Sequence, residues 1–408
     1  MTLFKLAFRN LWRNKRRSIL STATVAFGTL AVLVAASFME FSFYGLQETT
    51  IRTDLGHIQI ENPIPFQIGG EHPLVYGLDQ VTTLKHALSK MPAIRYSMAR
   101  LDLQGLVAFG EQSEIFVGRG VEPEKEEAFA ANFAPLIAGS GLTLATIEEP
   151  QERHIVLGET LAAKLGVKPG DWVTVLTNTV HGGLNGMDLK VAGLIRHFTP
   201  EYNERMALFP LAVAQELTQT DKVSRLIAVL RDTSKTEASL AQIHAQFPDL
   251  VLIPWYEKAV FYNSVVNLYW TIFGFLGSII FVVVILTSFN TLMMTVMERI
   301  PEVGTLMAVG MPRVKVMWVF LWEGGLIGLL GAIMGVIATL LVAVVVNMIE
   351  IPMPPPPGGT FGYPFKLHLV GQYFVLIPLF ITIACMLATY FPARYASNLN
   401  ISWALRHH

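Results

Sequence analysis

The chain of 408 residues is 52% hydrophobic and only 15% charged, and its mean hydropathy is +0.47. This charge content is well below the roughly 25% of an ordinary soluble domain, so the composition excludes that class and indicates an integral membrane protein. The net charge of −1 gives no indication of nucleic-acid binding, and the lone cysteine, Cys385, excludes an intramolecular disulfide.

Residues 1–17 are predicted to form a cytoplasmic amphipathic helix. They contain six basic residues and no acidic one, and Lys5, Arg9 and Arg13 follow one another at intervals of four. A helix with this pattern would lie in the lipid headgroup layer, although a plain continuation of the first span stays an alternative. By the positive-inside rule, we expect the N-terminus in the cytoplasm.

Residues 18–41 are predicted to be the first transmembrane helix. The run from Ser18 to Met39 has 22 uncharged residues behind a long basic flank. It lacks a convincing small-residue cleavage site, so we expect an uncleaved span that takes the chain across the membrane.

Residues 42–258 are predicted to form a large extracytoplasmic domain with a stalk, because no further stretch is long and apolar enough to span. The pattern alternates strands and helices in two β-α-β halves with an insertion between them. Strands are expected at 57–61, 101–109, 114–118, 154–158, 172–176, 189–195, 225–230 and 250–253, and helices at 79–90, 159–165 and 235–246. Four glutamates, Glu122, Glu124, Glu126 and Glu127, are expected to form a solvated face.

Residues 259–297 are predicted to form the second transmembrane helix together with a stalk. All 39 are uncharged, and as a helix they would extend about 58 Å, against a hydrocarbon core of about 30 Å. We therefore expect this helix, and the end of the first span, to continue beyond the membrane; a tilted span after a loop is the alternative.

Residues 298–314 are predicted to form a short helix across the cytoplasmic ends of two spans. Glu298 and Arg299 close the incoming helix, and Pro301 and Glu302 are typical of a new first turn. We expect the helix to point three apolar side chains toward a soluble partner: Val303, Leu306 and Met307. Within this segment, Gly304 and Gly310 bracket about two turns from Leu306 to Val309, and Arg313 follows.

Residues 315–348 are predicted to be the third transmembrane helix. Two G-x-x-x-G motifs favour close helix contact: Gly324 with Gly328, and Gly331 with Gly335. Glu323 is an intramembrane carboxylate and therefore a functional candidate. We favour a structural role in which it pairs with a neighbouring base, and proton coupling is the alternative.

Residues 349–368 are predicted to form an extracytoplasmic loop, residues 369–392 the fourth transmembrane helix, and residues 393–408 a cytoplasmic tail. The loop contains M-P-P-P-P-G-G, which is typical of a stiff polyproline II strut that acts as a spacer or contacts the outer domain. Basic residues gather in the segments expected inside, so both termini are predicted to be cytoplasmic.

Two motifs resemble the MacB/FtsX-like (LolC/LolE-type) family of ABC transporter permeases. The first is E-R-x-x-E-[IV]-G-x-[LM]-x-A-[LV]-G, matched by Glu298, Arg299, Glu302, Val303, Gly304, Leu306, Ala308, Val309 and Gly310. The second is the closing pattern of the family, matched by Pro392, Ala393, Arg394, Ala396, Ala404, Leu405 and Arg406, with Ser402 in place of a proline. His407 and His408 are either native or the remnant of a tag.

The resemblance implies an α-helical membrane protein with four transmembrane helices and a large α+β extracytoplasmic domain, in which a split β-α-β subdomain carries an inserted β-rich subdomain. It implies that the short helix couples to a cytoplasmic ABC ATPase dimer, which would hold the ATP and Mg²⁺. It also implies a second permease copy or a homologous permease, contact with membrane lipids, and the bacterial inner membrane as location.

For cargo, the resemblance implies extraction of lipoprotein or lipid, or efflux of an amphipathic substrate, with a periplasmic lipoprotein carrier or an adaptor as a further partner. A non-transporting FtsX-like regulator that activates an envelope hydrolase is the alternative. A secondary transporter that uses Glu323 is a third class.

The sequence offers no catalytic constellation. It contains no G-x-x-x-x-G-K-[ST] loop, no H-E-x-x-H pair and no G-x-S-x-G elbow. We therefore expect a non-enzymatic subunit without cofactor or metal, in which His181 and His197 are ordinary surface histidines.

Overall fold

The computed structural model describes residues 2–13, 15–64, 75–130, 134–149, 151–197, 199–349, 351–355, 360, 362 and 364–398. The chain forms two compact units. The membrane unit comprises Met1–Tyr44, Val265–Met353 and Pro364–His408, and the outer unit comprises Gly45–Ser264 and Pro354–Tyr363.

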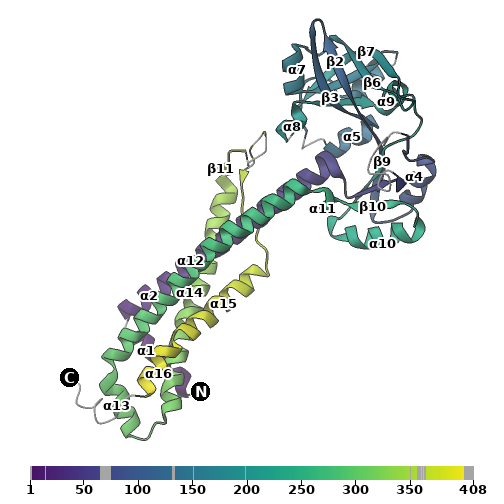
Figure 1. The fold of residues 1–408 in the computed structure, drawn as a ribbon. Coiled ribbons are helices and arrows are strands. Elements are labelled where there is room, and N and C mark those ends of the chain that lie inside the picture. The colour runs from purple at the N-terminus through teal and green to yellow at the C-terminus, as the bar shows by residue number, and fades with distance from the viewer. Residues whose placement is uncertain are drawn as a thin grey trace. The chain divides into compact units, whose positions relative to one another are not determined.

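The membrane unit is helical (Figure 1). Its elements are α1 (Thr2–Arg13), α2 (Lys15–Thr50), α12 (Val260–Glu298), α13 (Ile300–Ala308), α14 (Arg313–Ile349), α15 (Tyr373–Ala388), α16 (Tyr390–Ser397), β11 (Ile351–Pro352) and β12 (Pro364–Phe365). Four helical stretches of the described chain are long and apolar enough to cross a membrane: Lys15–Leu55, Val260–Glu298, Arg313–Ile349 and Tyr373–Ser397. The chain passes from one unit to the other within α2 and within α12.

The helix α12 has 39 residues, the length that its run of uncharged residues predicts. The fourth membrane helix begins at Tyr373, later than residue 369. The reason lies in the residues before it, which bond to neighbouring elements: Asn347 accepts from the Leu367 N–H at 2.8 Å, and the His368 N–H donates to Ser37 O at 3.1 Å. Within the predicted proline strut, residues 356–359 lie outside the described part of the chain.

The outer unit contains a first subdomain with a four-stranded antiparallel sheet in the order β10 (Val251–Pro254), β1 (Ile58–Glu61), β9 (Arg225–Leu230) and β2 (Ile94–Phe109). Its core includes Ile58 and Ala228 of the sheet, Leu88 of α4 (Val81–Ser89) and Ile243 of α10 (Thr236–Gln246), so both helices cover one face. Since β9 lies between β1 and β2, the β1-α4-β2 unit is a split β-α-β. The predicted fold of this subdomain is confirmed.

The second subdomain is inserted between β2 and β9 and is a closed ring of six strands. The ring runs from β2 through β3 (Gln112–Val121), β8 (Met206–Pro210), β5 (His154–Gly158), β7 (Leu184–Ile195) and β6 (Trp172–Asn178) back to β2. Its core is apolar, and Phe116 and Phe209 pack with ring centroids 5.5 Å apart. The β-rich insertion is therefore confirmed, and closure leaves these strands without a free edge.

The remaining elements of the outer unit connect or cover these two sheets. They are η1 (Ile51–Leu55, a π-helix), α5 (Pro123–Ala130), β4 (Leu136–Gly139), α6 (Leu142–Glu148), α7 (Glu159–Leu165), α8 (Pro200–Asn203), α9 (Leu211–Thr218), η2 (Thr233–Lys235) and α11 (Trp255–Lys258). Sequence analysis missed β4, β8, α6 and α9, whose short apolar runs lack a clear period.

The strand β2 belongs to both subdomains. Its residues from Ile94 to Arg100 pair with β9, and those from Arg100 to Phe109 pair with β3. Where β2 pairs with β6, a Cβ on Gly105 would lie 1.9 Å from Leu176 O. Only glycine permits this approach, so Gly105 is part of how the ring closes.

Candidate functional site: the connection between the second and third spans

The helix α13 forms where the sequence predicts it. The preceding helix ends at Glu298, Arg299 occupies the N-cap position of α13, and Pro301 stands in its first turn, where a missing N–H costs nothing. After the helix, Gly310 has φ +98°, a conformation that glycine adopts without strain. The charged interruption therefore folds as a nine-residue helix between two spans.

The predicted outward face of α13 is wrong for two of its three residues. Val303 and Met307 are only 3% and 7% exposed, and they lie in one core with Ile300 and with residues of α16 and α14. Leu306 is 41% exposed and Val309 is 85% exposed. The buried residues repeat at intervals of three and four, so they form the stripe that packs on the helix bundle.

The exposed residues of α13 are Glu302, Thr305, Leu306 and Ala308, and its C-cap residue Val309 is also exposed. Arg313 begins α14 in an exposed position. Gly304 lies inside the helix and is buried. Without a Cβ it adds no bulk to the packed stripe.

Surface ion pairs connect this end of α12 and α13 to the N-terminal helices. Arg13 of α1 pairs with Glu302, and Arg17 of α2 pairs with Glu298. The four side chains are between about a third and a half exposed, so each pair contributes at most about 1 kcal/mol. Figure 1 shows α1, α13 and α16 at the same end of the membrane unit.

A buried ion pair lies beneath this surface. Arg299 Nη1 is 3.3 Å from Glu323 Oε2, and the two residues are 4% and 3% exposed. Arg299 Nη2 also donates to Asn10 O at 3.2 Å, so one guanidinium links α14 to α1 from the start of α13. The structure agrees with a structural role for Glu323, in which the carboxylate pairs with a neighbouring base.

The two G-x-x-x-G motifs of α14 contact different helices. A Cβ on Gly324 or Gly328 would lie within 3 Å of Thr389 or Cys385, beside α15, whereas one on Gly331 or Gly335 would lie within 3 Å of Val25 or Thr29 of α2. The prediction of close helix packing at these glycines agrees with the structure. The motif of Gly324 and Gly328 packs against the fourth span, and the motif of Gly331 and Gly335 packs against the first.

The closing motif is described only in part. Ala393 and Ala396 of α16 are fully buried in the same core as Val303 and Met307. Ser402, Ala404, Leu405, Arg406, His407 and His408 lie outside the described residues.

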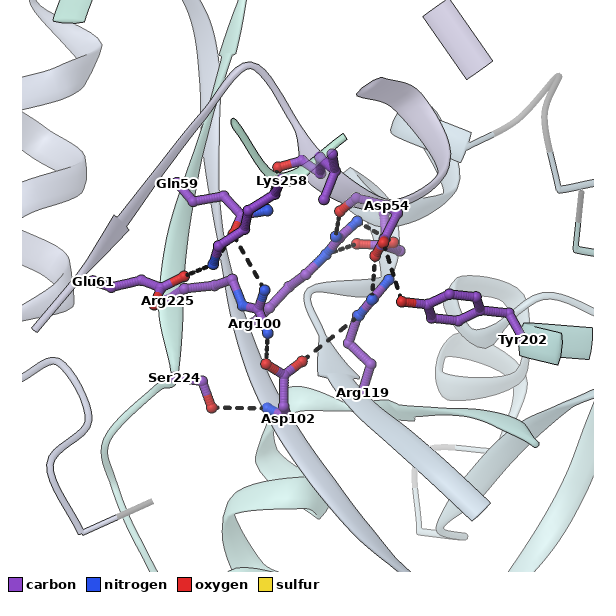
Figure 2. A network of polar contacts seen from close by, with 12 residues as sticks. Asp54, Gln59, Glu61, Arg100, Asp102, Arg119, Tyr202, Ser224, Arg225 and Lys258 are labelled. Carbon is purple, nitrogen blue, oxygen red and sulfur yellow. Dashed lines mark hydrogen bonds and ion pairs between the residues drawn. The ribbon is translucent and has the colours of Figure 1, made fainter. Parts of the chain in front are cut away.

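Sequence analysis missed an ionic network in the outer unit (Figure 2). Asp54 of η1 pairs with Arg119 of β3, and Asp102 of β2 pairs with Arg225 of β9 and lies 3.8 Å from Arg119 Nε. The network also includes the ion pair between Lys258 Nζ and Glu61 Oε1, which are 2.5 Å apart. The network thus connects η1 with strands of both subdomains.

A second branch of this network corrects, for Glu126, the prediction that Glu122, Glu124, Glu126 and Glu127 form a solvated face. Glu126 is 5% exposed, and its oxygens accept from Arg100 Nη2 at 2.6 Å and Nε at 3.0 Å. Arg100 also donates to Asp54 O. Burial lowers the pKa of Arg100 to about 10 although Glu126 opposes this effect, so the guanidinium stays charged at neutral pH. Glu124 and Glu127 are exposed, as predicted.

The predicted surface histidines differ from each other. His181 is exposed, but His197 is only 2% exposed, so the prediction is wrong for His197. A cluster of Glu149, Glu152 and His154 brings three potential metal-ligand atoms within 4.8 Å of one another. However, Lys190 Nζ already lies 2.7 Å from Glu149 and 2.8 Å from Glu152, so an ammonium group already binds both carboxylates.

Two family models match the chain, and together they cover most of it. Residues 18–246 match the MacB-like periplasmic core domain, and residues 265–401 match the FtsX-like permease C-terminal region. The first match contains most of α2 and most of the outer unit, and the second contains α13, α14 and α16.

Curated relatives agree with these models. The lipoprotein-releasing system transmembrane protein LolC of Haemophilus influenzae is 26% identical over 63% of this chain and 65% of its own length. The LolC protein of Xylella fastidiosa (strain Temecula1) is 29% identical over 56% of each chain. The chain therefore spans less than two thirds of the length of these relatives. The periplasmic region of MacB from Actinobacillus actinomycetemcomitans aligns at 12% identity over 51% of this chain and 92% of its own, with a TM-score of 0.37.

Proposed function

The chain belongs to the family of FtsX-like permeases with a MacB-like periplasmic core domain, and from this premise we propose that it is the membrane subunit of an ABC transporter. In this proposal a separate ATPase dimer binds α13 from the cytoplasm, and the dimer requires two permease chains because each chain supplies one such helix. ATP and Mg²⁺ belong to the ATPase. The chain itself transmits motion rather than catalysing a reaction.

The observation that supports the proposal best is the division of α13 into two faces. Ile300, Val303 and Met307 fix the helix to the bundle, while Leu306 and Val309 remain exposed on the opposite side. A short helix that is packed on one face and exposes apolar side chains on the other fits a groove on a soluble partner. The buried pair of Arg299 and Glu323 holds the start of this helix, so a displacement of α13 would also act on α14 and α1.

For output, we propose that α2 and α12 carry this motion to the outer unit, since the chain passes between the units within these two helices. The favoured cargo is a lipoprotein or another amphipathic molecule, because the relatives are named as lipoprotein-releasing proteins. A periplasmic carrier or adaptor would receive it.

The test of docking is copurification of the ATPase with the full chain. Leu306→Asp and Val309→Asp place a charge on the exposed face of α13 and are expected to reduce the bound ATPase at least about tenfold. The matched control is Ile147→Asp, an exposed apolar residue of α6 in the outer unit. Unchanged association of both α13 variants would contradict the assignment.

The test of cargo is release from reconstituted membranes. Proteoliposomes with this chain, its ATPase and a fluorescent acylated lipoprotein are expected to release the lipoprotein when ATP and a soluble acceptor are present. A regulator of an envelope hydrolase would instead raise hydrolase activity without any release. A secondary transporter would work without the ATPase, and full ATP-dependent release by Glu323→Gln would count against that class.

A further inference from the structure

A cavity in the outer unit lies between β8 and the helices α5 and α6. Its volume is about 280 Å³, and Thr53 of η1 reaches it from the end of α2. The lining is mainly aliphatic: Val121, Leu142, Val156, Ile195, Met206 and Leu208. This volume is at the lower end of ligand sites, so it suits one aliphatic chain rather than a drug-sized molecule.

One of the lining residues, His197, has a ring nitrogen without a hydrogen-bond partner among the described residues. His197 Nδ1 accepts from the Thr199 N–H at 3.1 Å, which places the proton of the neutral ring on Nε2. Burial lowers the pKa of His197 to about 4, so the ring is neutral at neutral pH. The Nε2–H group is buried and finds no acceptor among the residues that the structure describes. A buried donor without an acceptor is destabilising, and a ligand could supply the acceptor.

The charged groups at the cavity decide which acceptor fits. Both oxygens of Glu126 are bound by Arg100, and Glu127 accepts from the Thr143 N–H at 2.9 Å. Among the described lining residues the charged side chains are therefore carboxylates, with no cation to bind an anionic head group. A fatty-acid anion would be repelled, so the acceptor must be neutral, such as the carbonyl of an ester or an amide.

We propose that this cavity binds a single aliphatic chain carrying a neutral carbonyl group, with the chain against the aliphatic lining and the carbonyl oxygen accepting from His197 Nε2. This assignment is independent of the ATPase and of the cargo proposed above. It adds a binding site for an acyl ester or amide in the outer unit.

The contacts of His197 connect this site to the ionic network. Its ring packs at a tilt of 31° against Tyr202 with centroids 5.1 Å apart, and Tyr202 Oη donates to Asp54 Oδ2 at 3.4 Å. Its carbonyl oxygen accepts from Thr360 Oγ1 at 2.7 Å, in the segment between the third and fourth spans. A ligand on His197 would therefore act on Asp54 of η1 and on Thr360.

The experiment is photolabelling of the purified full chain without ATPase. The probe is methyl decanoate with a diazirine at the far end of its chain, and two companion probes are the corresponding free carboxylate and the corresponding alkane. Peptide mass spectrometry is expected to find the ester on the segments around Leu142 and Met206. The ester should label these segments about tenfold more strongly than the alkane or the carboxylate.

Matched variants separate the cavity from the surface. Ala130→Phe fills the cavity and is expected to reduce ester labelling at least about tenfold, whereas Ala128→Phe on the exposed side of α5 should leave it unchanged. His197→Phe keeps an aromatic ring but removes the donor, so ester and alkane should then label equally. Thermal unfolding of each variant checks the fold, and Ala130→Phe decides the matter if His197→Phe does not fold.

Labelling confined to the spans, or labelling that Ala130→Phe does not reduce, would overturn the proposal, as would equal labelling of the wild type by ester and alkane. Competition by a monoacylglycerol and by a singly acylated peptide then distinguishes a free lipid from an acylated protein as the source. Failure here would leave ATP-driven release untouched, because labelling needs no ATPase.

Discussion

The two units bury their charges in different ways. In the membrane unit the buried guanidinium of Arg299 faces one carboxylate, that of Glu323. In the outer unit Arg119 faces two carboxylates, those of Asp54 and Asp102. Among the described residues both units contain a buried guanidinium nitrogen without a partner, so the number of carboxylates is what separates them. When one member of an isolated buried pair is removed, the other charge stays buried without a partner. In a network, the remaining charge still has another partner of opposite sign. Removal of one charged residue should therefore lower the free energy of unfolding more in the membrane unit than in the outer unit.

The largest effect is expected from breaking the isolated pair. Glu323→Leu leaves the Arg299 guanidinium buried and unpaired, which should lower the free energy of unfolding by about 3–5 kcal/mol. The double variant Arg299→Met with Glu323→Leu should recover most of this loss, because two apolar side chains can replace a buried pair. Thermal unfolding in detergent measures both, and equal loss in the single and double variants would contradict this view.

The next effect concerns pH and belongs to the outer unit. Burial lowers the pKa of His57 to about 4, while Glu48 opposes this effect to a smaller extent. Its Nδ1 accepts from the Leu230 N–H at 3.3 Å, as a neutral ring does. The unfolded ring has a pKa of about 6.5 and binds its proton first, so stability should fall as the pH drops from about 6.5 to about 4, by roughly 3 kcal/mol.

Amide exchange of β1 and β9 across this pH range measures the effect in the full chain. His57→Gln should flatten the slope, although it lowers stability at pH 7. A slope that persists in the variant would assign the effect to another group.

A smaller effect is expected from the glycines that bring α14 against α2. A Cβ on Gly335 would lie 2.5 Å from Thr29 Cβ, whereas one on Gly274 of α12 has no described atom within 4 Å. Gly335→Ala should therefore destabilise the membrane unit by about 1–3 kcal/mol, and Gly274→Ala should be neutral or slightly stabilising. Unfolding of the two variants in the same detergent compares them directly, and equal effects would remove the packing argument.

The smallest effect is expected inside the network. Arg225→Met takes one partner from Asp102, but Arg119 Nε stays 3.8 Å away and Asp102 is about a third exposed. The loss should be only about 1 kcal/mol. If chemical unfolding shows a loss as large as that of Glu323→Leu, the contrast between the units fails.

The sequence predicts the elements better than it predicts which side of an element is buried. The α13 helix follows from Glu298, Arg299 and Pro301, which are local signals. Its packed face depends on Ala393 and Ala396 of α16, far along the chain, and both faces of the helix carry apolar residues. Periodicity alone therefore could not choose between Met307 and Leu306.

Charged residues in the outer unit were misjudged for a related reason. Glu126 lies in a polar segment that reads as a surface, and its partner Arg100 is 26 residues away in β2. The first half of β2, which ends at Arg100, was not predicted as a strand, because I-R-Y-S-M-A-R does not show the alternation of a half-buried strand. His197 gives no local signal at all, since its burial follows from Tyr202 and from the turn at Thr199.

The shared strand β2 has a consequence for how this unit can vary between homologues. The strand β2 is an edge strand of the first sheet and also one strand of the ring. An exchange of the ring alone would therefore place the junction with the foreign sequence within β2, between residues that are hydrogen-bonded to neighbouring strands. Chimaeras that transplant the ring together with all of β2 and β9 should express well. Those cut at Arg100 should be degraded, so we expect the two subdomains to be inherited as one piece.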